Sequence, residues 1–217
     1  MYFKRLNSNL SNGQIFFAIV TLNMIISWIF QKCIMTKSFY YKILSEQIEI
    51  NRIDKYIDIL QGYTLWGYIL FPIILLLKFS LISFLLQFFL LLKNIDIPMR
   101  QIFRTVMLAS LMLSLALVLQ IVILSVMPSK DITHNILKTV PLSLTHIFDL
   151  YKYPESSIIV FNAINPFEFL WIIIIYRGLV KTEAVNKVDC FVIVLSVWTT
   201  VLVFSWASIF YLNKINV

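Results

Sequence analysis

The chain has 217 residues, of which 60% are hydrophobic and 13% charged, and its formal net charge at pH 7 is +7. Soluble domains are nearer half apolar and a quarter charged, so this composition argues against one and indicates an integral membrane protein. The apolar runs are continuous instead of alternating at every second residue, which favours membrane helices over a β-barrel.

Five segments are apolar and long enough to cross a bilayer, and they predict an all-α polytopic helix bundle that forms one integral membrane domain, residues 1–217. The predicted spans are 14–35, 62–92, 105–127, 158–180 and 190–212. The basic residues are scattered between them, as the positive-inside rule and contact with anionic lipid require, so we expect no nucleic-acid partner.

The first span follows Lys4 and Arg5, as the apolar part of a signal peptide would. The stretch from Ile15 to Met35 is too long for a signal peptide, and no small-residue cleavage motif follows it. We therefore expect an uncleaved span with the N-terminus in the cytoplasm.

The segment 38–60 is the least hydrophobic part of the chain, and its apolar residues recur at approximately helical spacing among charged ones. This pattern predicts an amphipathic helix that lies on the outer membrane surface or caps the bundle. A docking surface for a partner is the alternative.

The second span is apolar for 31 residues and is interrupted mainly by Pro72 and Lys78. As one helix it would be about 46 Å long, more than the hydrocarbon core, so we expect a long span that is kinked at Pro72. Two separate spans would each be too short. Lys78 either extends along its own helix face to reach water or meets an acidic residue of another helix.

Small polar side chains at helical spacing indicate helix–helix contacts in three of the spans. They are Ser80, Ser83, Gln87, Ser110, Ser114, Ser196 and Thr200.

The segment 129–155 is the second predicted outer amphipathic region, with a short helix expected over 141–151. It contains both histidines, His134 and His146. Their spacing matches no metal-binding motif, and no cysteine or carboxylate pair accompanies them, so we expect no metal site.

The fourth span carries Asn162, Asn165, Pro166 and Glu168 at a depth where hydrocarbon is expected. As one continuous helix it would place the polar residues on a single face. Alternatively, Asn165 is an N-cap, Pro166 takes the first helical position and Glu168 only caps its own helix, so that the span is broken near Asn165. If Glu168 does not cap, Lys78 is its expected counter-ion, and Lys78, Asn162, Asn165 and Glu168 form a candidate intramembrane polar site.

The charge distribution predicts the orientation. With five spans, the segments on the N-terminal side hold eight basic and three acidic residues, whereas the two large loops on the other side are each neutral. The positive-inside rule then places the N-terminus in the cytoplasm and the C-terminus outside.

Motifs for catalysis are missing from the sequence. It has no G-x-S-x-G, no H-E-x-x-H, no P-loop and no acidic cluster for a metal. We therefore expect a protein that is not an enzyme and that has no cofactor.

Asn165-Pro166-Phe167, Trp171 and Gly178-Leu179 resemble the corresponding part of the Yip-domain family of membrane proteins. The resemblance covers about the last two-thirds of the chain and implies five spans with a cytoplasmic N-terminus. Eukaryotic members lie in Golgi and endoplasmic reticulum membranes and interact with small GTPases through a long N-terminal cytoplasmic region, which we expect this chain to lack. The Lys-, Ile- and Asn-rich composition is typical of a bacterial protein, so we expect the bacterial inner membrane.

These observations favour a non-catalytic subunit or scaffold of a membrane assembly, in contact with lipid and with other membrane proteins or further copies of the chain. A small transporter or lipid-handling permease, with its site at the broken fourth span, is the first alternative. A membrane immunity protein is the second.

Overall fold

The computed structural model describes residues 10–44, 50–128, 134–148 and 153–215. Within these ranges the chain is helical and contains no strand, which confirms the predicted all-α fold. Four of the described helices are long and apolar enough to cross a membrane, and a bent pair of helices makes a fifth span if it is counted as one.

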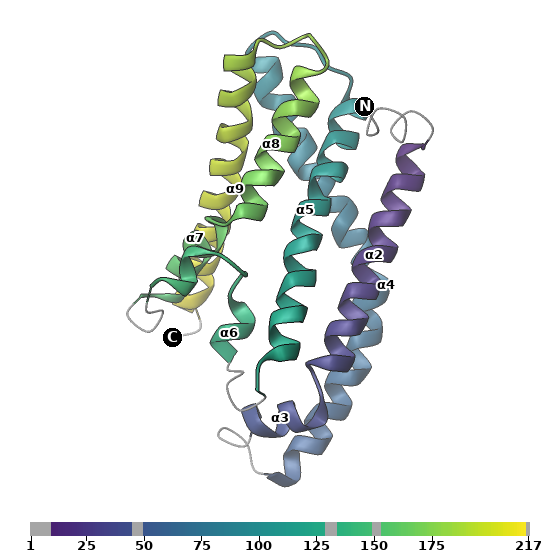
Figure 1. Ribbon diagram of the computed structural model, residues 1–217, viewed down its shortest axis with the longest axis vertical. Helices are drawn as coiled ribbons and strands as arrows, with labels where there is room; N and C mark the ends of the chain where they lie inside the picture. The colour runs from purple at the N-terminus through teal and green to yellow at the C-terminus, as the bar shows by residue number, and fades with distance from the viewer. Residues whose placement is uncertain (1–9, 45–49, 129–133, 149–152, 216–217) are drawn as a thin grey trace.

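The long helices of the described ranges run along the long axis of the bundle (Figure 1). They are α2 (Asn12–Cys33), α4 (Ile50–Leu92), α5 (Met99–Val126), α8 (Pro166–Val180) and α9 (Lys187–Ile215). Helix α5 is central, because it packs against α2, α4 and α8. Shorter elements gather toward one end: α3 (Lys37–Leu44), α6 (His134–Lys138), the 3-10 turn η1 (Leu144–His146) and α7 (Glu155–Ala163).

Polar contacts join the start of α2 to the start of α5, and the loop after α4 to the start of α9. They lie at the other end of the bundle, which we call the Asn12 end because α2 begins there with Asn12. Asn12 Nδ2 donates to the Arg100 carbonyl over 3.1 Å, and Arg104 Nη1 donates to the Leu10 carbonyl over 2.9 Å. Lys93 Nζ lies 3.2 Å from the Asp189 carboxylate, which joins the loop after α4 to the start of α9. The start of α2 and the end of α9 therefore lie at opposite ends of the bundle (Figure 1), as an odd number of spans requires.

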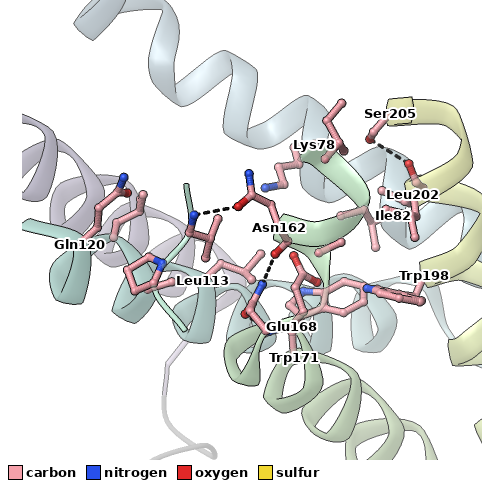
Figure 2. Close-up of a pocket in the computed structure, with 18 residues that line it drawn as sticks. Lys78, Ile82, Leu113, Gln120, Asn162, Glu168, Trp171, Trp198, Leu202 and Ser205 are labelled. Atoms are coloured by element: carbon pink, nitrogen blue, oxygen red, sulfur yellow. Dashed lines mark hydrogen bonds between the residues drawn. The ribbon is translucent and has the colours of Figure 1, made fainter. Parts of the chain in front are cut away.

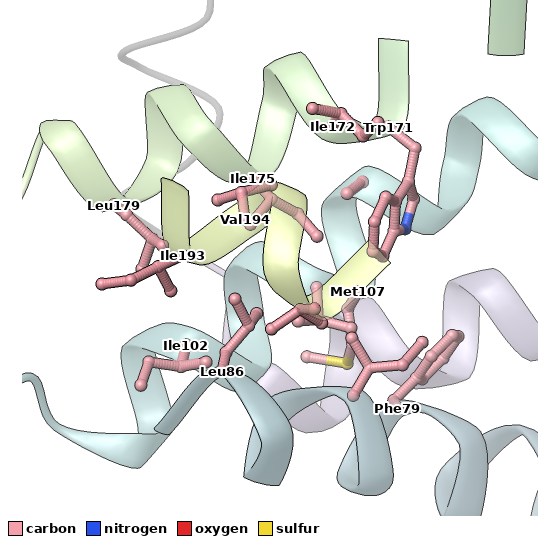
Figure 3. Packing of buried hydrophobic residues seen from close by; sticks show 14 of the residues in the cluster. Phe79, Leu86, Ile102, Met107, Trp171, Ile172, Ile175, Leu179, Ile193 and Val194 are labelled. Atoms are coloured by element: carbon pink, nitrogen blue, oxygen red, sulfur yellow. The ribbon is translucent and has the colours of Figure 1, made fainter. Parts of the chain in front are cut away.

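The hydrophobic core lies where α4, α5, α8 and α9 meet (Figure 3). Its members recur every three or four residues along each helix, so they form one stripe per helix. The largest fully buried side chains of the cluster include Phe79, Leu86, Leu90, Ile102, Met107, Ile175 and Leu179. The outward faces are also apolar: α4 exposes Leu65, Ile69, Ile73, Leu77 and Phe84. A continuous apolar surface of this kind is suited to hydrocarbon and not to water.

Helix α4 begins at Ile50, so residues 50–60 extend the second span instead of forming a separate helix on the membrane surface. Their amphipathic pattern is real, because Ile53 and Ile57 are fully buried while the charged residues around them are exposed. The buried stripe packs against protein, with α3 in contact with α4. Pro72 lies inside α4 without dividing it. The 43 residues of α4 span about 65 Å, so the helix extends beyond a hydrocarbon core of about 30 Å.

The described part of 129–155 departs from the predicted amphipathic helix over 141–151. Only the single 3-10 turn η1 forms there, and residues 149–151 lie outside the described ranges. Pro141 has no N–H to donate, and Leu142 has a φ of 60°, which no right-handed helix accommodates. The segment is held instead by side chains from other helices.

The small polar residues differ in what they contact. Ser110 and Ser114 are buried on α5, and Ser114 Oγ donates over 3.0 Å to Oδ1 of the buried Asn23 on α2. On α4, Ser83 is fully buried, whereas Ser80 and Gln87 are half-buried.

On α9, Thr200 donates over 2.7 Å to the carbonyl of Ser196, so this hydroxyl is satisfied within its own helix. Both side chains are half-buried.

Candidate functional site

The fourth span is broken, and the break is built by Asn165. Helices α7 and α8 meet at an angle of 60°. Asn165 is only 4% exposed, and its Oδ1 accepts from the backbone N–H groups of Phe167 and Glu168 over 2.8 and 2.9 Å. With Pro166 at the first helical position, these bonds confirm the predicted helix start.

The Asn165 amide also satisfies a backbone group that the break leaves over. Its Nδ2 donates to the Asn162 carbonyl over 2.6 Å. Pro166 has no N–H for this carbonyl, and an unpaired carbonyl at bilayer depth would be costly. One side chain therefore caps α8 and completes the end of α7.

Asn162 holds the segment before α7 in place. Its Oδ1 accepts from the Val140 backbone N–H over 2.9 Å and lies 3.3 Å from the hydroxyls of Ser143 and Thr145. Its Nδ2 donates to the Lys138 carbonyl over 2.9 Å. The Asn162 amide is therefore engaged in structure, although the sequence placed it in a polar site.

Gln120 on α5 binds the same segment from the opposite side. Its Nε2 donates to the carbonyls of Leu137 and Thr139 over 3.0 and 3.1 Å. Residues 137–145 are thus fixed between α5 and α7. The sequence identifies Gln120 only as the single amide of its span, because its partners lie 17 and 19 residues away.

A cavity of about 460 Å³ lies at the bend between α7 and α8 (Figure 2). It is bounded by residues of α4, α5, α7, α8 and α9 and by Val140 and Pro141. Lys78, Asn162, Asn165 and Glu168 all line it. The structure therefore brings together the four residues of the predicted intramembrane site.

The cavity reaches the outer surface of the bundle. Lys78, Leu117 and Ser205, from three different helices, line it and are exposed, whereas Asn165 and Trp171 are buried. Glu168 lies twelve residues before Val180, the Asn12 end of α8, and so about 18 Å along the helix. By the same measure Lys78 lies about 21 Å from Leu92. A hydrocarbon core of about 30 Å that begins near these two helix ends would contain both charges.

Lys78 and Glu168 are the ionisable residues that line the cavity. No direct ion pair joins these two described side chains, and Trp198 of α9 lines the cavity beside them. Figure 2 shows Glu168 beside the rings of Trp171 and Trp198.

Glu168 lies in the first turn of α8, where the predicted helix start places it, but it does not complete a capping box with Asn165. In the capping box of α2, Gln14 accepts from the Ser11 backbone over 2.8 Å, whereas the cap of α8 consists of the Asn165 side chain alone. Glu168 lines the cavity together with Lys78 and Trp198.

Comparison of the chain with protein-family models, with curated proteins and with solved structures gives no match. The resemblance to the Yip-domain family therefore stays a prediction. No group of His, Cys, Asp or Glu among the described residues is arranged to hold a metal ion.

Proposed function

We propose that this protein binds an amphipathic molecule from the bilayer in the cavity at the α7–α8 bend, as a small lipid-handling permease or transporter. The observation that supports this most is the cavity itself, in which Lys78 and Glu168 are held on different helices between apolar walls. A broken span with polar groups at membrane depth is a common binding-site arrangement in transporters.

The energetics favour a binding role for the two charges over a purely structural one. A charged side chain within the membrane costs about 2.5–3.5 kcal/mol on insertion scales, and intramembrane charges mostly pair with one another. Lys78 and Glu168 line the same cavity from different helices, and no ion pair joins these two described side chains. This arrangement leaves room for a ligand to complete the pairing.

Lipid retention tests the proposal. We expect the purified chain to retain about one amphipathic molecule per chain after mild-detergent extraction, as counted by mass spectrometry. Ser205→Trp narrows the exposed rim and should reduce this retention at least about fivefold. Ser208→Trp is the matched control, since Ser208 is also exposed and bonds only to its own helix, but does not line the cavity. Equal retention in both variants would contradict the proposal.

A scaffold role is a second candidate, and the length of α4 supports it. The part of α4 beyond the hydrocarbon core exposes Arg52, Asp54, Lys55 and Asp58. A charged face of this kind is suited to a polar partner surface. Mass spectrometry of proteins that co-elute in mild detergent tests this role, and a lone monodisperse monomer counts against it.

The proposed location is a bacterial inner membrane with the Asn12 end in the cytoplasm. Basic residues are concentrated in the short loops and the adjoining helix ends at this end of the bundle, as the positive-inside rule favours. Those in the described ranges are Lys93, Arg100, Arg104, Arg177, Lys181 and Lys187.

A further inference from the structure

We infer that the ligand of the cavity is a zwitterionic phospholipid with a primary ammonium, bound with its ammonium at Glu168 and its phosphate at Lys78. This inference rests on the proposed function and names the ligand class of the same site. It is based on the chemistry of three parts of the cavity: the carboxylate, the lysine and the walls.

The Glu168 carboxylate is suited to a primary ammonium. An ionised carboxylate has about four acceptor positions for hydrogen bonds. A primary ammonium carries three N–H donors, whereas a quaternary ammonium has none. The adjacent indoles of Trp171 and Trp198 add a favourable surface for a cation (Figure 2).

Lys78 supplies the complementary site for the phosphate. Its side chain is exposed at the rim of the cavity and comes from α4, while Glu168 comes from α8. A lysine ammonium forms charge-assisted hydrogen bonds with phosphate oxygens. With one positive and one negative group in the cavity, a ligand of zero net charge satisfies both, whereas an anionic lipid leaves Glu168 without a partner.

The walls and the opening indicate a lipid and not a free head group. Most lining residues are apolar, among them Ile82, Leu113, Leu117, Ile159 and Leu202. On the proposed placement in the membrane, the exposed rim lies at hydrocarbon depth, so acyl chains can remain in the bilayer while the head group enters. A water-soluble zwitterion has no such route.

Native mass spectrometry of the full-length, delipidated chain tests the inference. Phosphatidylethanolamine, phosphatidylcholine and phosphatidylglycerol are titrated separately, together with glycerophosphoethanolamine as the head group without acyl chains. We expect phosphatidylethanolamine to bind at least about fivefold more tightly than the other two lipids, and the free head group not to displace it at a hundredfold excess.

Variants of the two charged residues test which residue binds the ammonium and which binds the phosphate. Glu168→Gln should abolish the preference for phosphatidylethanolamine over phosphatidylcholine, and Lys78→Gln should weaken all three lipids about fivefold. Asp96→Asn and Lys181→Gln are matched controls on exposed residues outside the cavity and should leave the binding unchanged.

Three results overturn the inference. The first is equal binding of the three lipids to the unaltered chain, which needs no variant to fold. The second is an unchanged preference in Glu168→Gln, and the third is tight binding of the free head group. If lipid retention depends on the rim at Ser205 but head groups are not distinguished, the proposed function stands and this inference fails. If the unaltered chain retains no amphiphile, the proposed function itself fails.

Discussion

Two buried serines differ in whether their hydroxyls have a hydrogen-bond partner. Ser114 donates to Asn23 on α2, whereas Ser83 on α4 is fully buried and its Oγ has no partner among the described residues. Removing one partner of a buried hydrogen bond leaves the other partner buried and unpaired, which destabilises the fold. Removing a hydroxyl that had no partner leaves no group unpaired and removes the cost of burying that hydroxyl.

We therefore expect Ser114→Ala to lower the free energy of unfolding by about 1 kcal/mol. Ser83→Ala should leave it unchanged or raise it slightly. Titration with SDS, followed by circular dichroism, measures both. A larger loss for Ser83→Ala than for Ser114→Ala would show that the hydrogen-bond assignment is wrong.

Gly178 is required where α8 crosses α5 closely. A Cβ at this position would lie 2.3 Å from Thr105 Cγ2 and 2.9 Å from Thr105 Oγ1, closer than nonbonded atoms can approach. The two helices must therefore separate or Thr105 must move when Gly178 gains a side chain.

We expect Gly178→Ala to destabilise the fold by about 1–3 kcal/mol, the usual cost of overpacking. Thr105→Ala removes both clashing atoms and should recover most of the loss in the double variant. The midpoint of thermal unfolding in detergent measures each chain. If Gly178→Ala unfolds at the same temperature as the wild type, the close crossing does not exist.

Asn162 on α7 links this helix to the segment 137–145. The backbone N–H of Val140 donates to Asn162, and that of Leu144 donates to the Ile164 carbonyl over 3.2 Å. The segment 137–145 has little regular structure of its own, so its position depends on these bonds and on Gln120.

We expect Asn162→Ala to increase amide hydrogen exchange in residues 139–145 at least about tenfold, while exchange in α5 stays unchanged. Asn162→Asp keeps the acceptor for Val140 and should show a smaller increase. Hydrogen-exchange mass spectrometry resolves the segment. Unchanged exchange in Asn162→Ala would mean that another contact fixes it.

The break in the fourth span was predictable because its signal is local. Asn165 and Pro166 are neighbours, and the residue types of a helix start are the same in any context. The role of Asn162 was not predictable, because the partners of its side chain are 17 to 24 residues away and two of the four are backbone groups. The position of Trp198 beside Glu168 likewise depends on how α8 packs against α9.

For the whole molecule, the sequence was sufficient to predict the fold class and four to five spans, since both follow from the lengths of the apolar segments. It was insufficient for the start of α4. Charged residues around Ile53 and Ile57 fit a surface helix and an extension beyond the membrane equally well, and only the contact with α3 separates the two. The cavity depends on five elements meeting, which no periodicity encodes.

The central claim is that the cavity at the α7–α8 bend opens to hydrocarbon. A spin label at Ser205→Cys, in a chain with Cys33→Ser, reports this directly in reconstituted vesicles, because the remaining Cys190 is buried. A label at Lys181→Cys, in an exposed loop, is the aqueous reference. We predict that the Ser205 label collides mainly with oxygen, which partitions into lipid, and that the Lys181 label collides mainly with a water-soluble nickel chelate. If the nickel chelate reaches both labels equally, the cavity opens to water and the account is contradicted.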